Sequence, residues 1–379
     1  MSTHMRIFLP LALAAIAAPD AAAQSVFDSE LRVAPQFLQY ELKSPNQETI
    51  SQLAVPVFVT IPFGSRFTFD VGTSYARVQV KSPNTISEIA GLTDTQLRGN
   101  LTLGTDFIVL TAGVNLPTGQ SSVTLEQLAA AGRIGNDFLA FPISNMGTGL
   151  ASTAGIAIAR PLGSWNIGFG GAVRHSQEYD PFNLPGQTLR FQPGDEYRAR
   201  VGMDHTLGAG RVTFGVTYSA FGDDAAGPSV YNTGNRVIAQ SVVTNSFGST
   251  DVTLAAYNVF RSPGRFASGD PTGRENIANV FLGVGINALG TLIEPTIEGR
   301  HWLQNVPGAT SGTTTSAERT QSSYLGTLGL RTRIGLGPIT AYPSGGYTLG
   351  RLATVNVSNT PTTADFTGFR AQLAIRMAP

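Results

Sequence analysis

The chain has 379 residues, of which only 13% are charged, and its 25 basic and 25 acidic side chains give a formal net charge of zero. This balance lacks the basic footprint of a nucleic-acid-binding protein, so we expect no nucleic-acid partner. Cysteine is absent, which excludes disulfides, thiolate metal sites, cysteine nucleophiles and the acylated cysteine of a bacterial lipoprotein.

The first residues have the pattern of a secretory signal peptide. An apolar run of about 12 residues follows Arg6, and Ala21-Ala22-Ala23 provides a small-residue cleavage site. A membrane-spanning helix needs about 20 apolar residues, and no other run in the chain is long enough. We therefore expect residues 1–23 to be a signal peptide and residues 24–379 to form the exported domain.

The exported part repeats one unit, in which two alternating segments flank a tight turn that contains glycine and a longer polar loop follows. Glycine supplies the positive φ that tight hairpin turns require. Seven such turns give fourteen strands, and a strand at each end, about Arg32–Leu42 and Asp365–Met377, brings the number to sixteen. The turns lie at Phe63-Gly64-Ser65, Gly104-Thr105, Leu162-Gly163-Ser164, Leu207-Gly208-Ala209-Gly210, Phe247-Gly248-Ser249, Leu289-Gly290 and Gly335-Leu336-Gly337-Pro338.

The alternation within these segments indicates half-buried strands. In Arg211–Phe221 one face carries arginine, threonine, glycine and serine, while the other carries valine, phenylalanine and tyrosine. A soluble two-sheet protein would also alternate, but it would rarely keep short turns on one side and long loops on the other through sixteen strands. Pro56, Pro295 and Pro343 each remove a ladder donor inside a proposed strand, where bulges would absorb them, and a fourteen-strand barrel stays open.

These patterns predict an all-β protein, a transmembrane antiparallel up-and-down β-barrel of about sixteen strands. An even number of strands places both termini on the periplasmic side, with short periplasmic turns and long extracellular loops. The expected location is the outer membrane of a Gram-negative-type bacterium, where membrane lipid and the barrel-insertion machinery are partners. The chain ends in Met377-Ala378-Pro379 without the terminal aromatic residue that this machinery commonly reads. A monomer and a homo-oligomer such as a trimer both stay open.

The third of the long loops, Thr118–Thr148, is the longest and contains a short predicted helix at Thr124–Ala131. We expect Ser122 to cap this helix and Gly132 to close it. Another long loop is expected at Ser82–Leu92.

The third loop has two interpretations. In the sixteen-strand general porins, a third loop with a short helix folds into the lumen and narrows it. If this one does so, Glu126, Arg133 and Asp137 are candidates for the pore constriction. The alternative is an outward-facing loop that covers the barrel mouth.

Charged side chains on the polar faces of the strands are expected to line the lumen. Charged rings set the sign selectivity of a pore, although such charges also brace barrel walls. An unpaired arginine facing lipid at the midplane would cost about 2–4 kcal/mol, so the set favours a wet lumen. Its members are Asp70, Asp94, Arg98, Arg174, Arg198, Arg200, Asp204, Arg211, Glu294, Glu298, Arg300, Arg331, Arg333, Arg370 and Arg376.

Aromatic residues near the strand ends are candidates for the belts that sit at the two membrane interfaces. The candidates are Trp165, Trp302, Tyr75, Tyr218, Tyr257, Tyr347 and Phe369.

Catalysis finds little support in the sequence. His175 stands next to Ser176 with Glu178 nearby, but adjacent residues of a strand point to opposite faces, so His175 is poorly placed to activate Ser176. No nucleophile elbow, zinc-protease motif or phosphate-binding loop occurs. The pair Asp223-Asp224 is a weak signal for a cation. We expect that the protein is not an enzyme and that it has no cofactor and no metal site. A hydrolase with its site at the rim of the barrel is the alternative.

A family resemblance adds to this interpretation. Val114-Asn115-Leu116-Pro117-Thr118-Gly119 ends one predicted strand, Gly147-Thr148-Gly149 precedes the next, and Ala159-Arg160-Pro161-Leu162-Gly163-Ser164-Trp165 follows at a turn. This order resembles the MetA-type family of outer-membrane proteins, which is found with meta-pathway phenol degradation and is grouped with transporters of hydrophobic compounds. Glu294-Pro295-Thr296-Ile297-Glu298-Gly299-Arg300 and Pro343-Ser344-Gly345-Gly346 also look like it, so the resemblance covers about two-thirds of the chain.

The resemblance implies a transport role, although none of its short motifs names a solute or a site. We expect a porin-like channel for passive uptake of small solutes, with hydrophobic or aromatic compounds as the implied class. A barrel with a structural or adhesive role is the main alternative.

Overall fold

The computed structural model describes residues 30–43, 47–104, 107–183, 185–186, 188–288, 291–307, 310–311, 314–315, 319–355 and 361–377. The expected signal peptide, residues 1–23, lies outside the described residues. Within the described part, no helix is both long enough and apolar enough to span a membrane.

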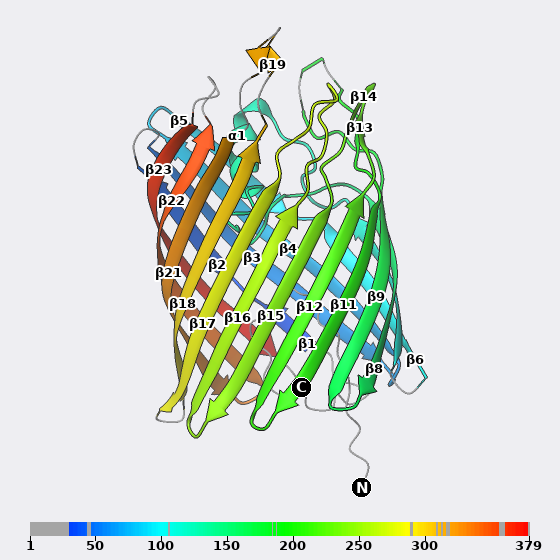
Figure 1. Ribbon diagram of the computed structural model, residues 1–379, viewed down its shortest axis with the longest axis vertical. Coiled ribbons are helices and arrows are strands. Elements are labelled where there is room, and N and C mark those ends of the chain that lie inside the picture. Colours follow the sequence, from blue (N-terminus) through cyan, green and yellow to red (C-terminus); the bar gives the residue numbers. More distant parts are fainter. Residues whose placement is uncertain are drawn as a thin grey trace.

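The wall is one closed antiparallel sheet of sixteen strands, as the sequence predicts (Figure 1). Eighteen segments form it, because β1 and β2 are two parts of one wall strand and so are β5 and β6. The first wall strand pairs with β3 on one side and with the last strand on the other, which closes the barrel. The segments are β1 (Glu30–Val33), β2 (Gln36–Leu42), β3 (Glu48–Phe63), β4 (Phe67–Ser82), β5 (Thr85–Leu92), β6 (Thr95–Leu103), β7 (Ile108–Leu116), β8 (Ala151–Leu162), β9 (Trp165–Ser176), β11 (Glu196–Leu207), β12 (Gly210–Phe221), β15 (Arg236–Phe247), β16 (Thr250–Arg261), β17 (Glu275–Ala288), β18 (Thr291–Val306), β21 (Arg319–Leu336), β22 (Ile339–Val355) and β23 (Pro361–Met377).

Short turns join the strands at one end of the barrel, the lower end in Figure 1, and the long connections lie at the other. Six of the seven predicted turns contain a glycine with φ between 56° and 68°, which only glycine adopts without strain. The seventh, Leu289-Gly290, lies outside the described residues, although β17 and β18 pair on either side of it. The loop end also carries short strands that pair with one another. β10 (Phe191–Gln192) pairs with β13 (Asp224–Ala226), β13 pairs with β14 (Ser229–Tyr231), and β19 (Thr310–Ser311) pairs with β20 (Thr314–Thr315).

Pro56, Pro295 and Pro343 interrupt the ladder without inserting a residue. Pro56 faces the break between β1 and β2, and the pairing of β2 resumes in the same register. The ladders beside Pro295 and Pro343 likewise skip residues and resume in the same register. An extra residue occurs instead at Thr93-Asp94, where the register of β4 shifts by one between β5 and β6. This bulge reverses which residues of the strand point inward.

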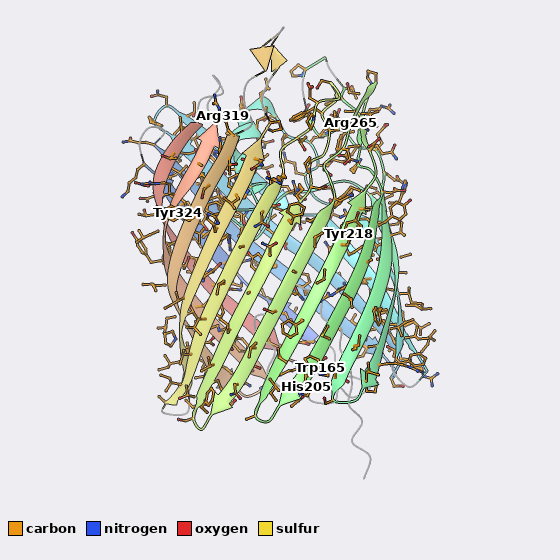
Figure 2. All side chains as sticks on the ribbon, viewed as in Figure 1. Trp165, His205, Tyr218, Arg265, Arg319 and Tyr324 are labelled. Atoms are coloured by element: carbon orange, nitrogen blue, oxygen red, sulfur yellow. The ribbon has the colours of Figure 1, made fainter. Side chains whose placement is uncertain are left out.

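The outer face of the barrel is apolar and exposed. Along β12, Phe214, Val216 and Tyr218 point outward, while the intervening residues point inward. Figure 2 shows Trp165 and His205 near the turn end of the outer face, and Tyr218 and Tyr324 nearer the loop end. The outer face therefore has an apolar surface with amphipathic aromatic side chains toward both ends, the pattern of a membrane-spanning barrel.

The polarity of the two faces is reversed at the loop ends of β2 to β5, β22 and β23. There the inner face is apolar and buried, with Tyr40, Ile50, Val78, Ile89 and Phe366 among its residues. The outer face carries ion pairs, Arg77 with Glu88 and Arg351 with Asp365. Charged pairs suit contact with water rather than with lipid, so these strand ends lie beyond the apolar belt.

This extension corrects the prediction of a long loop at Ser82–Leu92. β4 continues to Ser82, Pro83-Asn84 form a tight turn, and β5 returns along it. Ser87 and Ile89 both point inward from β5 and are buried against the third loop. This burial favours a strand rather than a loop for these residues.

Candidate pore lumen

The strand register places the charged residues predicted for the lumen on the inner face, the face opposite to the exposed apolar residues. Asp70 pairs with Arg98, Asp204 faces Thr213, and Glu294 faces Arg331 across neighbouring strands. Several of these side chains stay accessible to water although a closed wall surrounds them. Arg211, near the turn end, is 60% exposed, and Arg198, near the loop end, is 45% exposed.

Ion pairs between neighbouring strands hold many of these charges. Toward the turn end, Glu30 is buried between Arg32 and Arg376, with a nitrogen–oxygen distance of 2.6 Å to each. Arg98 lies 3.2 Å from Asp70, and Arg331 lies 2.7 Å from Glu294. These contacts brace the wall, and they leave the exposed sides of the arginines facing the interior.

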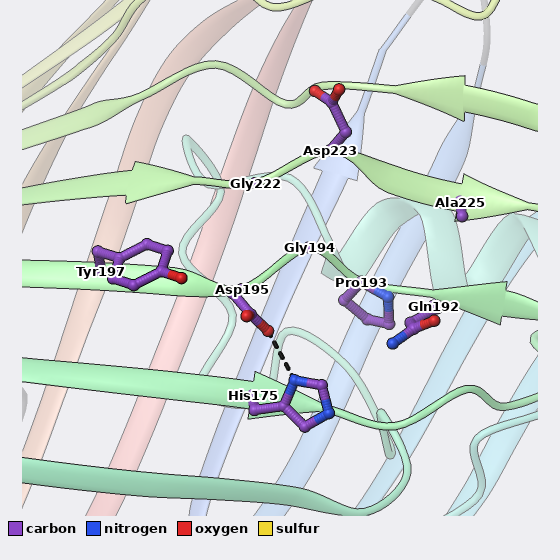
Figure 3. A pocket seen from close by; sticks show the side chains of 9 residues that line it. All are labelled: His175, Gln192, Pro193, Gly194, Asp195, Tyr197, Gly222, Asp223 and Ala225. Atoms are coloured by element: carbon purple, nitrogen blue, oxygen red, sulfur yellow. Dashed lines mark hydrogen bonds and ion pairs between the residues drawn. The ribbon is translucent and has the colours of Figure 1, made fainter.

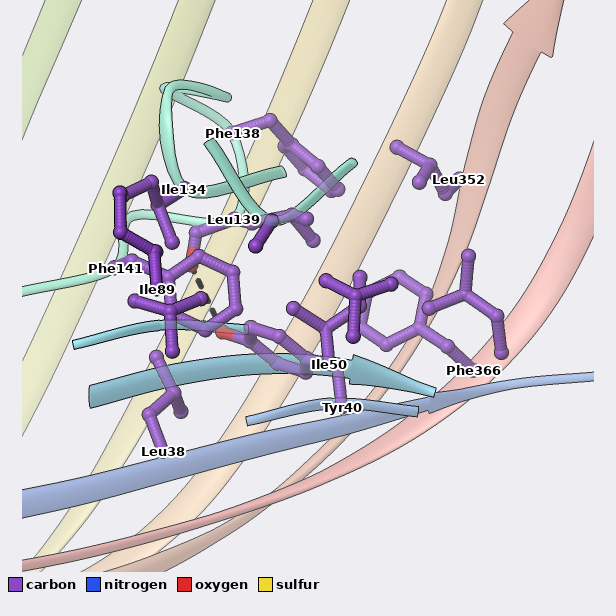
Figure 4. Packing of buried hydrophobic residues seen from close by; sticks show 14 of the residues in the cluster. Leu38, Tyr40, Ile50, Ile89, Ile134, Phe138, Leu139, Phe141, Leu352 and Phe366 are labelled. Atoms are coloured by element: carbon purple, nitrogen blue, oxygen red, sulfur yellow. Dashed lines mark hydrogen bonds between the residues drawn. The ribbon is translucent and has the colours of Figure 1, made fainter. Parts of the chain in front are cut away.

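The third loop folds inside the barrel and packs on the reversed, apolar part of the inner wall (Figure 4). Its helix α1 (Leu128–Ile134) presents Ala130 and Ile134, and the following turn presents Phe138 and Leu139. All four are almost fully buried against residues such as Tyr40, Ile50, Ile89 and Phe366. The interpretation of the loop as an outward-facing cover is therefore wrong.

The ends of the predicted helix also need correction. Thr124, not Ser122, caps a 3₁₀ turn, η1 (Leu125–Gln127), that leads into α1. The Gln127 side chain accepts a hydrogen bond from the Thr124 amide, whereas the Ser122 hydroxyl donates to the carbonyl of Asp180 in the next loop. The helix continues through Gly132 to Ile134, which becomes buried, and Gly135 is its C-cap.

Polar side chains of the inner wall hold the backbone of the loop. The fully buried Gln52 amide donates to the Ile143 carbonyl at 2.7 Å and accepts from the Ile143 amide at 2.9 Å. The Tyr40 hydroxyl donates to the Leu139 carbonyl at 3.0 Å. The Ser87 hydroxyl donates to the Glu126 carbonyl and accepts from the Ala130 amide of α1. Sequence reasoning missed these residues, although Gln52 is a polar residue between the apolar Ile50 and Ala54 on one strand face.

Asp94 joins the two ends of the third loop to the wall. Its carboxylate accepts hydrogen bonds from the Gly119 amide at 3.1 Å and the Thr148 amide at 2.7 Å. The bulge at Thr93-Asp94 turns this side chain inward. A Cβ on Gly119 would lie 2.1 Å from the Met146 carbonyl oxygen, so only glycine fits where the loop ends cross.

The three constriction candidates occupy different positions. Glu126 lies exposed within η1, near the loop end of β5, and its carbonyl accepts a hydrogen bond from Ser87. Arg133 makes two hydrogen bonds, of 2.9 and 2.6 Å, to the buried carboxylate of Glu48 on the wall. Asp137 reaches the other side and pairs with Arg261 of β16 at 3.1 Å. The loop thus extends from β3 to β16 across the interior.

Two of the predicted belt residues lie inside the barrel. Trp302 stacks on Phe138 of the third loop with ring centres 5.7 Å apart. Tyr257 points inward in the same row as Arg300, whose guanidinium donates to the Phe138 carbonyl at 2.7 Å. Trp302 and Tyr257 are therefore not part of the interfacial belts, because they share a strand face with Arg300 and Arg261.

At the rim of the barrel, the structure does not bring the side chains of His175, Ser176 and Glu178 together. The His175 Nδ1 lies 2.7 Å from an Asp195 oxygen (Figure 3). Ser176 is buried, and as the next residue of the strand it points to the opposite face. Glu178 pairs with Arg190 instead. The shallow depression beside His175 is lined by Asp195, Tyr197 and Asp223. Across the described residues, no group of three acidic or histidine side chains is arranged to hold a metal ion.

The fold and these contacts define a closed sixteen-strand antiparallel barrel with an apolar exterior, a charged inner wall and an inserted third loop. No family model matches the chain, and no curated protein matches it. The resemblance to the MetA-type family therefore stays a prediction.

Similar solved structures are outer-membrane proteins. They include a bacterial polysaccharide outer membrane secretin (10% identity over 92% of this chain and 99% of that one, TM-score 0.46). OmpT, an outer membrane protein of Vibrio cholerae, has 10% identity over 95% of this chain and 100% of its own, with a TM-score of 0.44. An outer membrane channel from Pseudomonas putida F1 has 12% identity over 96% of this chain and 100% of its own, with a TM-score of 0.38. At this level of similarity the fold rests on the strand pairing described above.

Proposed function

We propose that the protein is an outer-membrane channel for passive diffusion of small solutes. The observation that carries the proposal is the exposure of charged side chains inside a closed wall. Arg211 near the turn end is 60% exposed, and at the level of the third loop Asp137 and Arg261 are 46% and 34% exposed. Water therefore has access along the inner wall from the turn end up to the loop, as a diffusion pathway requires.

The outer face supports placement in a membrane. Exposed leucine, valine and phenylalanine side chains cover its middle, and aromatic residues such as Trp165 and Tyr218 lie toward its two ends. In this proposal the export signal at residues 1–23 is removed, and the insertion machinery assembles the barrel with its short turns in the periplasm.

The third loop is the proposed constriction. It is fixed on one side of the interior by Gln52 and Tyr40, and its Asp137 meets Arg261 on the other. Of the three sequence candidates, Asp137 has the position that best suits contact with a passing solute. Arg133 acts on the loop through Glu48, and Glu126 lies at the outer entrance. The hydrophobic or aromatic solute class comes from the family resemblance alone.

Planar-bilayer recording of the purified protein tests the channel. The proposal predicts stepwise, ohmic current increases in KCl as single barrels insert. A correctly folded protein that inserts into the bilayer and gives no current would contradict it and would favour a structural or adhesive barrel.

A further inference from the structure

The inner wall from β11 through β12, β15 and β16 to β17 combines an arginine row with an apolar patch. Near the loop end, Arg198, Ser219, Arg236 and Arg261 are successive partners in one row of the sheet. One step toward the turn end, Arg200, Thr217, Ile238, Val259 and Ile277 form the next row. Cross-strand partners have Cβ atoms about 5 Å apart, and inward residues of one strand are about 7 Å apart, so the rows are in contact.

The apolar patch is unusual because its residues face the interior. Ile238 and Val259 are half-buried, and Ile277 is buried, on the same face as the charged lumen residues. Toward the turn end the next inward row is Gln240 and Tyr257, so the patch ends there. None of these three residues belongs to the cluster that buries the third loop, although Asp137 of the loop reaches the arginine row at Arg261.

The arginines beside the patch have unused hydrogen-bonding capacity. Glu196 lies 2.8 Å from Arg198 and 3.8 Å from Arg236, and Asp137 pairs with Arg261. Among the described residues, Arg200 makes no ion pair, and the buried Nε of Arg236 has no acceptor. The Arg236 guanidinium is held over the Phe221 ring, 5.6 Å from its centre. The buried Nε is out of reach of a solute, but the Arg236 side chain as a whole is 30% exposed, so its other guanidinium nitrogens and those of Arg200 can donate to a solute.

From this juxtaposition we infer that the wall holds a binding site for organic carboxylates with an apolar body, such as aromatic acids. The carboxylate accepts hydrogen bonds from Arg200 and Arg236, because the planar guanidinium matches two carboxylate oxygens. The apolar body lies on Ile238 and Val259. This inference rests on the proposed channel function and names the class of solute that the channel prefers.

Block of the KCl current by added solutes tests the inference. Benzoate is the probe, acetate has the carboxylate without the ring, and benzyl alcohol has the ring without the charge. The site predicts that benzoate blocks at a concentration about tenfold lower than either, because only benzoate uses both parts. Equal blocking concentrations for benzoate and acetate would overturn the inference.

Substitutions locate the site. Arg200→Gln removes an arginine without breaking an ion pair, and it should raise the blocking concentration of benzoate about tenfold. Val259→Thr keeps the shape of the side chain, and it should weaken block by benzoate but not by acetate. The control is Arg77→Gln, which removes an arginine from the outer face together with its ion pair to Glu88 and should leave block by benzoate unchanged.

The outcomes separate the two proposals. Benzoate block that is unchanged in both Arg200→Gln and Val259→Thr would overturn the site. A KCl current without a preference for benzoate would overturn only this inference, whereas the absence of any KCl current would overturn the channel and the site together.

Discussion

The Asp94 carboxylate accepts a hydrogen bond from the Thr148 amide at 2.7 Å. This bond fixes the end of the third loop to the wall at the bulge between β5 and β6. The same carboxylate accepts from the Gly119 amide, so one side chain sets the separation of both loop ends. Hydrogen bonds to a charged acceptor contribute about 1.5–3 kcal/mol each. The position of the proposed constriction therefore depends on a residue outside the loop.

Asp94→Asn should loosen the loop, because the amide replaces one acceptor oxygen with a donor that faces a backbone N–H. We expect larger fluctuations of the open-channel current and faster proteolysis within residues 120–145. Asp251→Asn is the control, since Asp251 faces the interior near the turn end and its carboxylate accepts a hydrogen bond from the neighbouring Ser246 hydroxyl rather than from the third loop. Equal current noise in both variants would show that Asp94 does not hold the loop.

Substitution of alanine for two glycines of the third loop should change the stability of the protein in opposite directions. In Gly119→Ala the new Cβ would lie 2.1 Å from a carbonyl oxygen, so the loop ends must separate. In Gly132→Ala the Cβ meets nothing within 4 Å, and alanine favours a helix by up to about 1 kcal/mol. Urea unfolding in detergent should give a lower midpoint for the first and an equal or higher midpoint for the second. The reverse order would contradict the crossing of the loop ends.

The two tryptophans should differ in their access to lipid. Trp165 lies on the outer face and stacks on His205, whereas Trp302 lies inside and stacks on Phe138. In vesicles with quencher-labelled lipid, Trp302→Phe, which keeps Trp165, should be strongly quenched. Trp165→Phe, which keeps Trp302, should be quenched little. Similar quenching of the two variants would place Trp302 back in the interfacial belt.

Removal of the buried charge at Glu298 should be costly. Glu298 lies 2.8 Å from both Arg300 and Arg370, and the Asn279 amide donates to it at 2.6 Å. Glu298→Gln leaves Arg300 buried without a charged partner, and loss of about 3 kcal/mol of unfolding free energy is expected. The exposed pair of Arg351 and Asp365 is the contrast, and Arg351→Gln should cost far less unfolding free energy, because water screens an exposed pair. Unfolding free energies that are equal in the two variants would contradict the buried network.

The membrane part of the fold could be predicted from the sequence because lipid and water impose the alternation directly. Arg211 and Thr213 point inward and Val212 and Phe214 outward in the structure, as period two requires. The same rule failed beyond the apolar belt. There Tyr40 and Ile50 face inward because the third loop, distant in sequence, replaces water inside the barrel.

The site was only partly accessible to sequence reasoning for related reasons. The position of Trp302 could have been found, since it shares the parity of Glu298 and Arg300 on one strand. The role of Asp94 could not, because it depends on a bulge that alternation does not reveal. The apolar patch at Ile238 and Val259 was missed because apolar side chains were assigned to the lipid face.

Substituted-cysteine accessibility tests the central claim, a water-filled lumen, most directly, because the chain has no cysteine of its own. Thr217 points inward on β12, and the neighbouring Val216 points outward. In a planar bilayer, a charged methanethiosulfonate reagent should reduce the KCl current through Thr217→Cys and leave that through Val216→Cys unchanged. Current that the reagent leaves unchanged in Thr217→Cys, despite a thiol shown to be modified, would contradict conduction through the barrel interior.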